Sequence, residues 1–417
     1  MIDIFNREVL RQCGEPRQAV AAGDHFPSLT RARGMSPEQL VEIIERSGLT
    51  GKGGAGFPTY RKIELMQRQV SYLKYLVVNG SEHEPGSLKD RHLLENYPAT
   101  VLEGALILAH ATGVCDVQIA VNESAVEAIS LFNSAIEMLA ASGDLQIRRE
   151  PSVSITVVPV PESYMVGEES ALLEVLEGRQ PLPRKRPPFP IEAGLYGLPT
   201  LIQNVETVAH LPYIITYGSD SYRSLGVNEK GVTLCTFGDE FENGGVQLIP
   251  LGISLREVVY EYGGGLKSGK SIKAVQPGGP SAGFLVEAQL DVPFQGEALK
   301  LAGSALGCAA IRAFSHDDDM VAAVAEIMEF FARNSCGQCP SCRMETKMLS
   351  SIMKQTLSGR GNARLLKQIP VIINANVTKG ICGLIKMPVD PMLSALSNFG
   401  DEFDGYMVDG GQKKQWA

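Results

Sequence analysis

Four cysteines constrain this 417-residue chain more than any other feature. Cys336, Cys339 and Cys342 are separated by two residues each, and Cys382 follows much later. This spacing lets three thiolates turn toward one point while a distant fourth closes the cage, as in ferredoxin-like ligation of a 4Fe–4S cluster. Two alternatives stay open. A structural zinc site more often pairs its ligands and includes a histidine, and buried unliganded thiols are common in proteins. We predict a 4Fe–4S cluster.

The composition excludes several classes of protein. The formal net charge is −9, which argues against a nucleic-acid or anionic membrane surface. There is no run of about 18 apolar residues, so we expect no membrane-spanning segment. The first eleven residues lack the pattern of a signal peptide, and eight cysteines without an export signal indicate a reducing compartment. We therefore expect a cytoplasmic protein that would meet a membrane only through a complex.

The first half of the chain alternates short apolar runs with amphipathic segments. The apolar runs cover residues 75–78, 117–121 and 155–160, and the segments near 100–111 and 124–141 lie between them. Strand, helix and strand in this order predict a parallel sheet with helical crossovers, which is an α/β fold.

A second unit is expected after the proline-rich residues 181–190. Apolar runs at 232–237, 246–249 and 272–275 predict strands, and their order suggests a small β-grasp (ubiquitin-like) domain. From Asp317 onward apolar residues recur at helical spacing, so the four cysteines belong to a helical bundle. The predicted parts are an N-terminal segment with the α/β domain (1–228), the β-grasp domain (229–315), the helical 4Fe–4S domain (316–404) and a loose tail (405–417).

Three loops of a ligand-binding type are expected at one edge of the parallel sheet. The glycine-rich segment 51–59 lets backbone amides approach a phosphate or an aromatic ring. The acidic loop 79–86 follows the first strand, at the edge where parallel sheets bind ligands. The segment 164–170 follows the third strand. Each alone could be a plain turn or a solvated acidic loop, but three together predict a binding site.

With these motifs, the chain resembles the flavin- and NADH-binding subunit of respiratory complex I and its relatives in NAD-linked hydrogenases and formate dehydrogenases. The resemblance rests on the glycine loop, the acidic loop ending in Lys-Asp-Arg (89–91), the Tyr-x-x-Gly-Glu-Glu segment (164–169), residues 187–190 and 204–207, and the cysteine motif. It implies a Rossmann-like domain in which FMN and NADH share one cavity. It also implies a ubiquitin-like insert and a 4Fe–4S cluster that receives electrons from the flavin.

The resemblance further implies roles for individual residues. Catalytic roles fall to Lys62, Glu82 and Glu169, and the four cysteines would ligate the cluster. Phe57 and Phe189 would enclose the adenine. The implied cofactor-binding residues are Gly51, Gly53, Gly54, Phe57, Lys62, Asn79, Glu82, Glu84, Tyr164, Gly167, Glu168, Glu169, Phe189, Asn204 and Thr207.

Three positions depart from the family pattern. Ser81 stands where aspartate is usual, Gln203 where the first of two asparagines is common, and Leu65 where an aromatic ring would stack on the adenine. Losing one ring of such a stack costs about 1 kcal/mol. These departures favour a diverged paralogue in a dedicated reductase or dehydrogenase complex.

The sequence therefore predicts an enzyme that oxidises NADH, with hydride passing to FMN and single electrons passing to the cluster. A core subunit of complex I is one alternative. A non-enzymatic, ferredoxin-linked electron-transfer subunit is another, although such relatives lack the Gly-Glu-Glu segment. Because no further cysteine motif is visible, we expect a hetero-oligomer with an iron–sulfur acceptor protein (2Fe–2S or ferredoxin-like) and no nucleic-acid partner.

Overall fold

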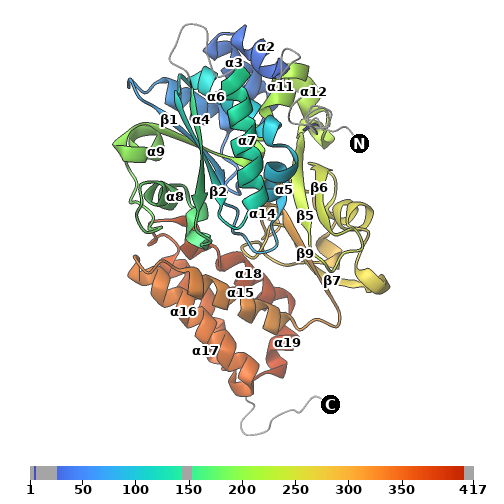
Figure 1. The fold of residues 1–417 in the computed structure, drawn as a ribbon. Coiled ribbons are helices and arrows are strands. Elements are labelled where there is room, and N and C mark those ends of the chain that lie inside the picture. The colour runs from blue at the N-terminus through green and yellow to red at the C-terminus, as the bar shows by residue number, and fades with distance from the viewer. Residues whose placement is uncertain (1–3, 6–25, 143–152, 408–417) are drawn as a thin grey trace.

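The computed structural model describes residues 4–5, 26–142 and 153–407, so most of the predicted tail lies outside it. Figure 1 shows a parallel sheet with its helices, a second sheet beside it, and a helical part below both. The described chain is thus a mixed α/β structure followed by helices, as the sequence predicts.

The first sheet has four parallel strands in the order β3-β2-β1-β4. The three predicted strands are present as β1 (Tyr75–Gly80), β2 (Asp116–Asn122) and β3 (Ser154–Val160). The fourth, β4 (Thr200–Asn204), pairs with the free side of β1. Its pattern of two apolar residues between polar ones does not reveal it.

Helices cover both faces of this sheet. Leu76 and Val78 of β1 belong to one buried cluster and Val77 to another, as the alternation of side chains along a strand requires. The first cluster also holds the inner faces of α6 (Pro98–Thr112) and α7 (Val126–Ser142), and the second holds α8 (Glu169–Leu176). Strands covered on both sides read as continuous apolar runs, which explains why they are visible in the sequence.

Shorter helices complete this part. α3 (Pro37–Ser47) begins with a capping box, in which the Ser36 hydroxyl accepts the Gln39 N–H and the Gln39 side chain accepts the Ser36 N–H. The others are α2 (Pro27–Arg33), α4 (Thr59–Gln67), α5 (Lys89–Asn96), α9 (Pro190–Ala193), α10 (Val205–Ala209), α11 (Leu211–Tyr217) and α12 (Ser219–Arg223).

The second sheet has five strands in the order β6-β5-β9-β7-β8. β5 and β6 form an antiparallel hairpin, β9 runs parallel to β5, and β7 is antiparallel to β9 and to β8. Three of these strands lie where they were predicted. The elements are β5 (Val232–Phe237), β6 (Gly245–Pro250), α13 (Leu255–Glu257), β7 (Ile272–Gln276), β8 (Leu285–Val286), α14 (Gly296–Leu301) and β9 (Ala310–Ser315).

In the helical part the four cysteines lie at helix ends and in the loops between helices. Cys336 and Cys339 lie between two helices, Cys342 lies in the first turn of the second, and Cys382 immediately precedes the turn η9 (Gly383–Lys386). The predicted apolar stripe, which includes Phe331, is buried core. The helices are α15 (Met320–Asn334), α16 (Pro340–Gln355), α17 (Ala363–Asn376), α18 (Val389–Asn398) and α19 (Gly400–Gly405).

Candidate flavin and iron–sulfur sites

The carboxyl edge of the first sheet brings two asparagines together. Asn79 at the end of β1 lies opposite Asn204 at the end of β4. β2 and β3 lie on one side of β1, and β4 lies on the other side. The order in which strands are added to the sheet therefore reverses at β1, and such a point leaves a crevice at the carboxyl edge. The Asn204 amide donates to the Asn79 carbonyl at 3.4 Å, and the Asn79 amide donates to the Gly167 carbonyl at 3.3 Å. The acidic loop and the 164–170 loop are thereby joined.

A cavity of about 810 Å³ opens at this crevice. Ligand pockets usually measure about 300–1,000 Å³, and all three predicted loops contribute to its walls. The predicted cofactor-binding residues that line it are Gly51, Gly53, Phe57, Lys62, Asn79, Glu82, Glu84, Tyr164, Gly167, Glu168, Glu169, Phe189 and Asn204. The three positions that depart from the family pattern, Leu65, Ser81 and Gln203, line it as well.

Gly54 and Thr207 are among the predicted residues but do not line this cavity. Gly54 has φ +107°, a conformation that favours glycine, and shapes the glycine loop. Thr207 is fully buried, and its hydroxyl accepts the Lys52 N–H at 2.9 Å. The Lys52 ammonium also points away from the cavity and donates to the Val232 carbonyl at 2.8 Å. These contacts hold the glycine loop against the second sheet.

Glu82 and Glu169, two acidic residues of the cavity, form hydrogen bonds or ion pairs with neighbouring segments. The Glu82 carboxylate accepts the N–H groups of Asp90 at 3.1 Å and Arg91 at 2.9 Å, so it caps the start of α5. Glu169 forms an ion pair with Lys62, whose ammonium also donates to the Ile202 carbonyl at 3.0 Å. The three residues expected to be catalytic therefore lie in one cavity, and each carboxylate already has a partner.

Arg186 is a cavity residue that the sequence reasoning missed. It pairs with Glu168, which is the N-cap of α8 and accepts the N–H groups of Ser170 and Ala171. Its Nε atom is buried without a partner. A signal was present in the sequence, because residues 183–188 are basic as well as proline-rich.

Glu84 differs from the other acidic residues because its Oε1 atom is buried without a partner. Burial raises the pKa of this carboxyl to about 7, and the nearby Tyr164 hydroxyl opposes the rise only in part. The Tyr164 hydroxyl itself donates to the Met387 sulfur at 3.1 Å. Glu84 thus offers the cavity a hydrogen-bonding carboxyl whose charge changes near neutral pH.

Replacing Glu84 by glutamine should stabilise the cofactor-free protein more at pH 8 than at pH 5. The folded-state pKa of about 7 exceeds the ordinary value of 4.5. The folded state therefore holds the extra proton between these values, and stability is lost as the pH rises through that window. The amide carries no charge and avoids this loss. Thermal melting of the wild-type and Glu84→Gln proteins from pH 5 to pH 8 measures it, and parallel curves would contradict the assignment.

A buried ionic network forms part of the cavity wall, and the sequence did not predict it. The Lys89 ammonium lies 2.6 Å from Asp90 and 3.1 Å from Glu206, and all three residues are almost fully buried. Burial alone would lower the pKa of Lys89, but the two carboxylates outweigh it and raise that pKa. Burial likewise opposes ionisation of Glu206, yet Lys89 lowers its pKa overall. Lys89 and Glu206 are therefore a charged pair, and Glu206 also accepts the Leu234 N–H of β5 at 2.8 Å.

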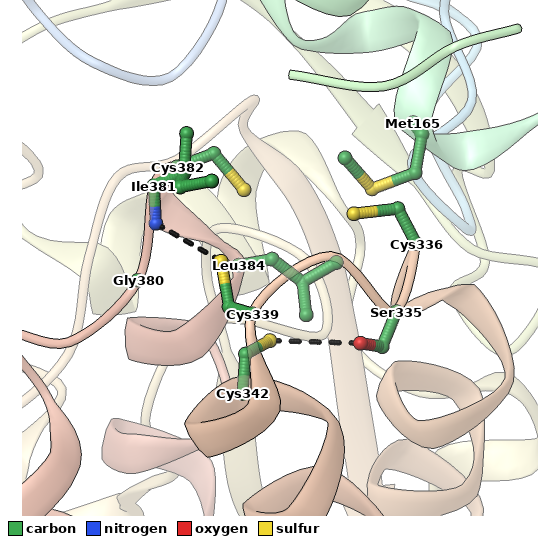
Figure 2. Close-up of a pocket in the computed structure, with 9 residues that line it drawn as sticks. All are labelled: Met165, Ser335, Cys336, Cys339, Cys342, Gly380, Ile381, Cys382 and Leu384. Atoms are coloured by element: carbon green, nitrogen blue, oxygen red, sulfur yellow. Dashed lines mark hydrogen bonds between the residues drawn. The ribbon is translucent and has the colours of Figure 1, made fainter. Parts of the chain in front are cut away.

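The four cysteines surround a second, much smaller cavity, and their sulfur atoms face it (Figure 2). Every cysteine in the described part of the chain is a free thiol, and Cys13 lies outside that part. The Ile381 N–H donates to the Cys339 sulfur at 3.3 Å, and the Ser335 hydroxyl lies 3.6 Å from the Cys342 sulfur. Among the described residues, no three His, Cys, Asp or Glu side chains are placed to hold a single metal ion.

Burial raises the pKa of the Cys342 thiol and raises that of Cys382 to about 11. Both groups are neutral thiols in the protein chain alone. Iron is ligated by thiolates, so cluster binding at these residues releases protons.

The two cavities share a wall. Met165, Cys382 and Leu384 line both of them. Met165 comes from the turn η2 (Tyr164–Gly167) after β3, whereas the other two come from the helical part. The segment that closes the larger cavity therefore also closes the cysteine cavity.

Comparison with known proteins assigns these two regions separately. Residues 44–213 match the family model described as the Nuo51 FMN-binding domain. Residues 322–406 match the NADH-ubiquinone oxidoreductase-F iron-sulfur binding region. The F subunit of NADH-quinone oxidoreductase from Mycobacterium tuberculosis is 36% identical over 394 residues, covering 93% of this chain and 88% of the relative. The F subunit from Escherichia coli is 36% identical over 379 residues, covering 89% and 85%.

Solved structures agree with this assignment. An NAD+-reducing [NiFe]-hydrogenase in the H2-reduced state matches with a TM-score of 0.85 and 26% identity, covering 97% of this chain and 67% of that chain. The air-oxidised state matches with a TM-score of 0.81 and 27% identity, covering 96% and 67%. Fold, cavity and cysteines together define an iron–sulfur flavoprotein. The chain belongs to the family of the NADH-quinone oxidoreductase F subunit.

The residues present fit the cofactors of this family. Four buried polar atoms without a partner belong to residues of the larger cavity: His83 Nε2, Glu84 Oε1, Arg186 Nε and Gln203 Nε2. Buried polar groups are almost always hydrogen-bonded, so a polar ligand is expected to complete them. Four thiols around one small cavity are the donor set of a 4Fe–4S cluster, and the iron–sulfur family match favours this over zinc or inert thiols. Across the described residues, no helix combines the length and apolarity needed to cross a membrane.

Proposed function

We propose that this protein is the NADH-oxidising, electron-input subunit of a redox complex. Its larger cavity holds FMN and NADH, and its four cysteines hold a 4Fe–4S cluster. The wall shared by the two cavities carries the proposal, because it brings a flavin in the first next to a cluster in the second. Bound FMN supplies the conversion between the two-electron chemistry of nicotinamide and the one-electron chemistry of the cluster.

The chain's own residues position the ligands. The Lys62–Glu169 pair presents an ammonium and a carboxylate side by side in the cavity, where hydrogen bonds to a flavin or a nicotinamide are needed. Glu82, in the acidic loop, accepts hydrogen bonds from the first turn of α5 and so fixes the loop against this helix. Phe57 and Phe189, 42% and 51% exposed, provide aromatic faces for the adenine. Gly54 and Thr207 act through the glycine loop.

An absorbance spectrum of the anaerobically purified protein tests this function. We expect a flavin band and broad iron–sulfur absorption, and both should bleach when NADH is added. An EPR signal of a reduced cluster should appear in the same sample. Protein that contains both cofactors but does not react with NADH would support the non-enzymatic electron-transfer alternative. The Tyr164, Gly167, Glu168 and Glu169 side of the cavity favours the enzyme, because a plain electron carrier needs no dinucleotide cavity.

Replacing Leu65 by phenylalanine should lower the KM for NADH. Leu65 lines the same cavity as Phe57 and Phe189 and is 38% exposed. A ring at this position would add one face to the adenine stack, worth about 1 kcal/mol, or about fivefold in affinity. Initial rates with an artificial dye acceptor measure the KM, and Leu65→Met serves as a control for side-chain size. An unchanged KM would contradict the stacking argument.

We also propose the domain limits expected from the sequence: 1–228 for the flavin domain, 229–315 for the insert and 316–404 for the cluster domain. A β-grasp insert is supported by strand order. Numbered within the insert, the order β6-β5-β9-β7-β8 is 2-1-5-3-4, with the first and last strands parallel at the centre and a helix between the second and third. This is the order of ubiquitin-like folds.

The proposed partner is an iron–sulfur protein of the 2Fe–2S or ferredoxin type that docks beside the cluster, in a hetero-oligomeric complex of the cytoplasm or its membrane face. Ser81, Gln203 and Leu65 favour a dedicated reductase or dehydrogenase complex over complex I itself. Alone, the protein should reduce small dyes with NADH. Reduction of the physiological acceptor should become fast only when the partner is added, and rapid ubiquinone reduction by the single chain would contradict this.

A further inference from the structure

Met165 is the residue through which the flavin domain reaches the cluster cavity. It is 6% exposed and lies on η2, at the carboxyl edge of the first sheet. The other residues that line the cluster cavity lie between Ser335 and Leu384, in the helical part. Figure 2 shows the Met165 side chain entering this cavity from its own segment, with its sulfur beside the Cys336 sulfur.

Met165 packs among apolar groups on the cluster side, and on its other side lies the larger cavity, which also holds charged groups. Met165 packs in one buried cluster with Cys342, Leu384 and Ile385. The larger cavity on its opposite side contains charged groups such as the Lys62–Glu169 pair and is wide enough for water. A flexible, unbranched thioether fills an irregular gap of this kind well.

Of the three residues shared by both cavities, Cys382 is a proposed ligand and Leu384 lies two residues beyond it on the same turn. Met165 alone of the three comes from the flavin domain. Its side chain is therefore the part of the flavin domain that separates the larger cavity from the cysteine cavity.

We propose that Met165 is a positioning residue that keeps water of the flavin cavity away from the 4Fe–4S cluster and thereby holds the cluster's reduction potential low. The inference rests on the proposed function. A cluster with four thiolate ligands becomes more negative when it gains an electron, and water stabilises the more negative state. Excluding water from it therefore lowers the potential, and the same exclusion protects the cluster from oxidative loss.

Three substitutions in the full chain, purified anaerobically with its cofactors, test the proposal. Met165→Ala opens the wall, Met165→Gln keeps its length but makes it polar, and Met165→Leu keeps it filled and apolar. Met353→Ala is the matched control, because Met353 is a fully buried methionine of α16 that lines neither cavity. The readouts are the cluster potential from an EPR-monitored redox titration and the lifetime of cluster absorbance in air.

The alanine and glutamine variants should shift the cluster potential to less negative values and shorten the lifetime in air several-fold, whereas Met165→Leu and Met353→Ala should match the wild type. Unchanged values in Met165→Ala would overturn the proposal, as would an equally large shift in Met165→Leu or Met353→Ala. If Met165→Ala does not fold, Met165→Gln decides in the same way. Wild-type protein without a cluster signal would instead refute the proposed function.

Discussion

Replacing Cys339 by alanine is expected to abolish the 4Fe–4S cluster while leaving the flavin bound. The change removes one of four thiolates and also the acceptor of the Ile381 N–H, which holds the Cys382 loop in place. Cys339 lines the smaller cavity but not the larger one in which we propose that the flavin binds, so the proposed flavin contacts remain. The cluster should be lost almost completely, because three protein ligands leave one iron open to solvent.

Iron and flavin content per chain, with the EPR signal of the reduced protein, measure this result. Cys115→Ala is the matched control, since Cys115 is a free cysteine that lines neither cavity. Iron content and EPR signal near those of the wild type would refute the ligand assignment. Loss of flavin together with iron would show that the shared wall collapses without the cluster.

Replacing Lys89 by methionine is expected to lower the free energy of unfolding by about 3–5 kcal/mol, because it leaves Asp90 and Glu206 buried without their cation. Flavin affinity should fall as well, since Lys89 and Asp90 line the flavin cavity. Burial already raises the pKa of Asp90 to about 7, so removing the ammonium drives this carboxyl further toward its protonated form.

Denaturant unfolding of the cofactor-free protein measures the change. Lys354→Met is the control, because Lys354 forms an ion pair with Glu329 at 2.9 Å on the surface, where its side chain is 57% exposed. Such pairs contribute about 0–1 kcal/mol. A loss of stability at Lys89 no larger than at Lys354 would show that water reaches the buried network.

Much of the fold could be predicted because its signals are local. β1 and β2 are covered on both faces, so they stand out as apolar runs, and the capping box at Ser36 marks the start of α3. β3 is a half-exposed edge strand, but its run of residues 155–160 is apolar enough to be seen. β4 and β9 were not predicted. Both are short and mix polar with apolar residues, and they are strands because β1, β5 and β7 offer them open edges.

The candidate site, like the fold, has parts that local motifs predict and parts that depend on packing between distant segments. Most of the predicted cofactor-binding residues do line the larger cavity, because each loop motif is contiguous in the chain. The direction of the Lys52 and Thr207 side chains depends on packing between the glycine loop, α10 and the second sheet, which no local pattern records. Lys89 and Asp90 resemble a solvated surface pair in the sequence, and only Glu206, far along the chain, makes their burial possible.

The wall shared by the two cavities also sets an order for the protein's biosynthesis. The glycine loop, the acidic loop and the Tyr164 turn leave the ribosome early, but Cys382, Leu384 and Met387, which complete the flavin cavity, are made after both sheets. A nascent chain that has finished its sheets still has a flavin cavity open on this side. Completion of the larger cavity, and of the proposed flavin site within it, therefore awaits synthesis of the helical part.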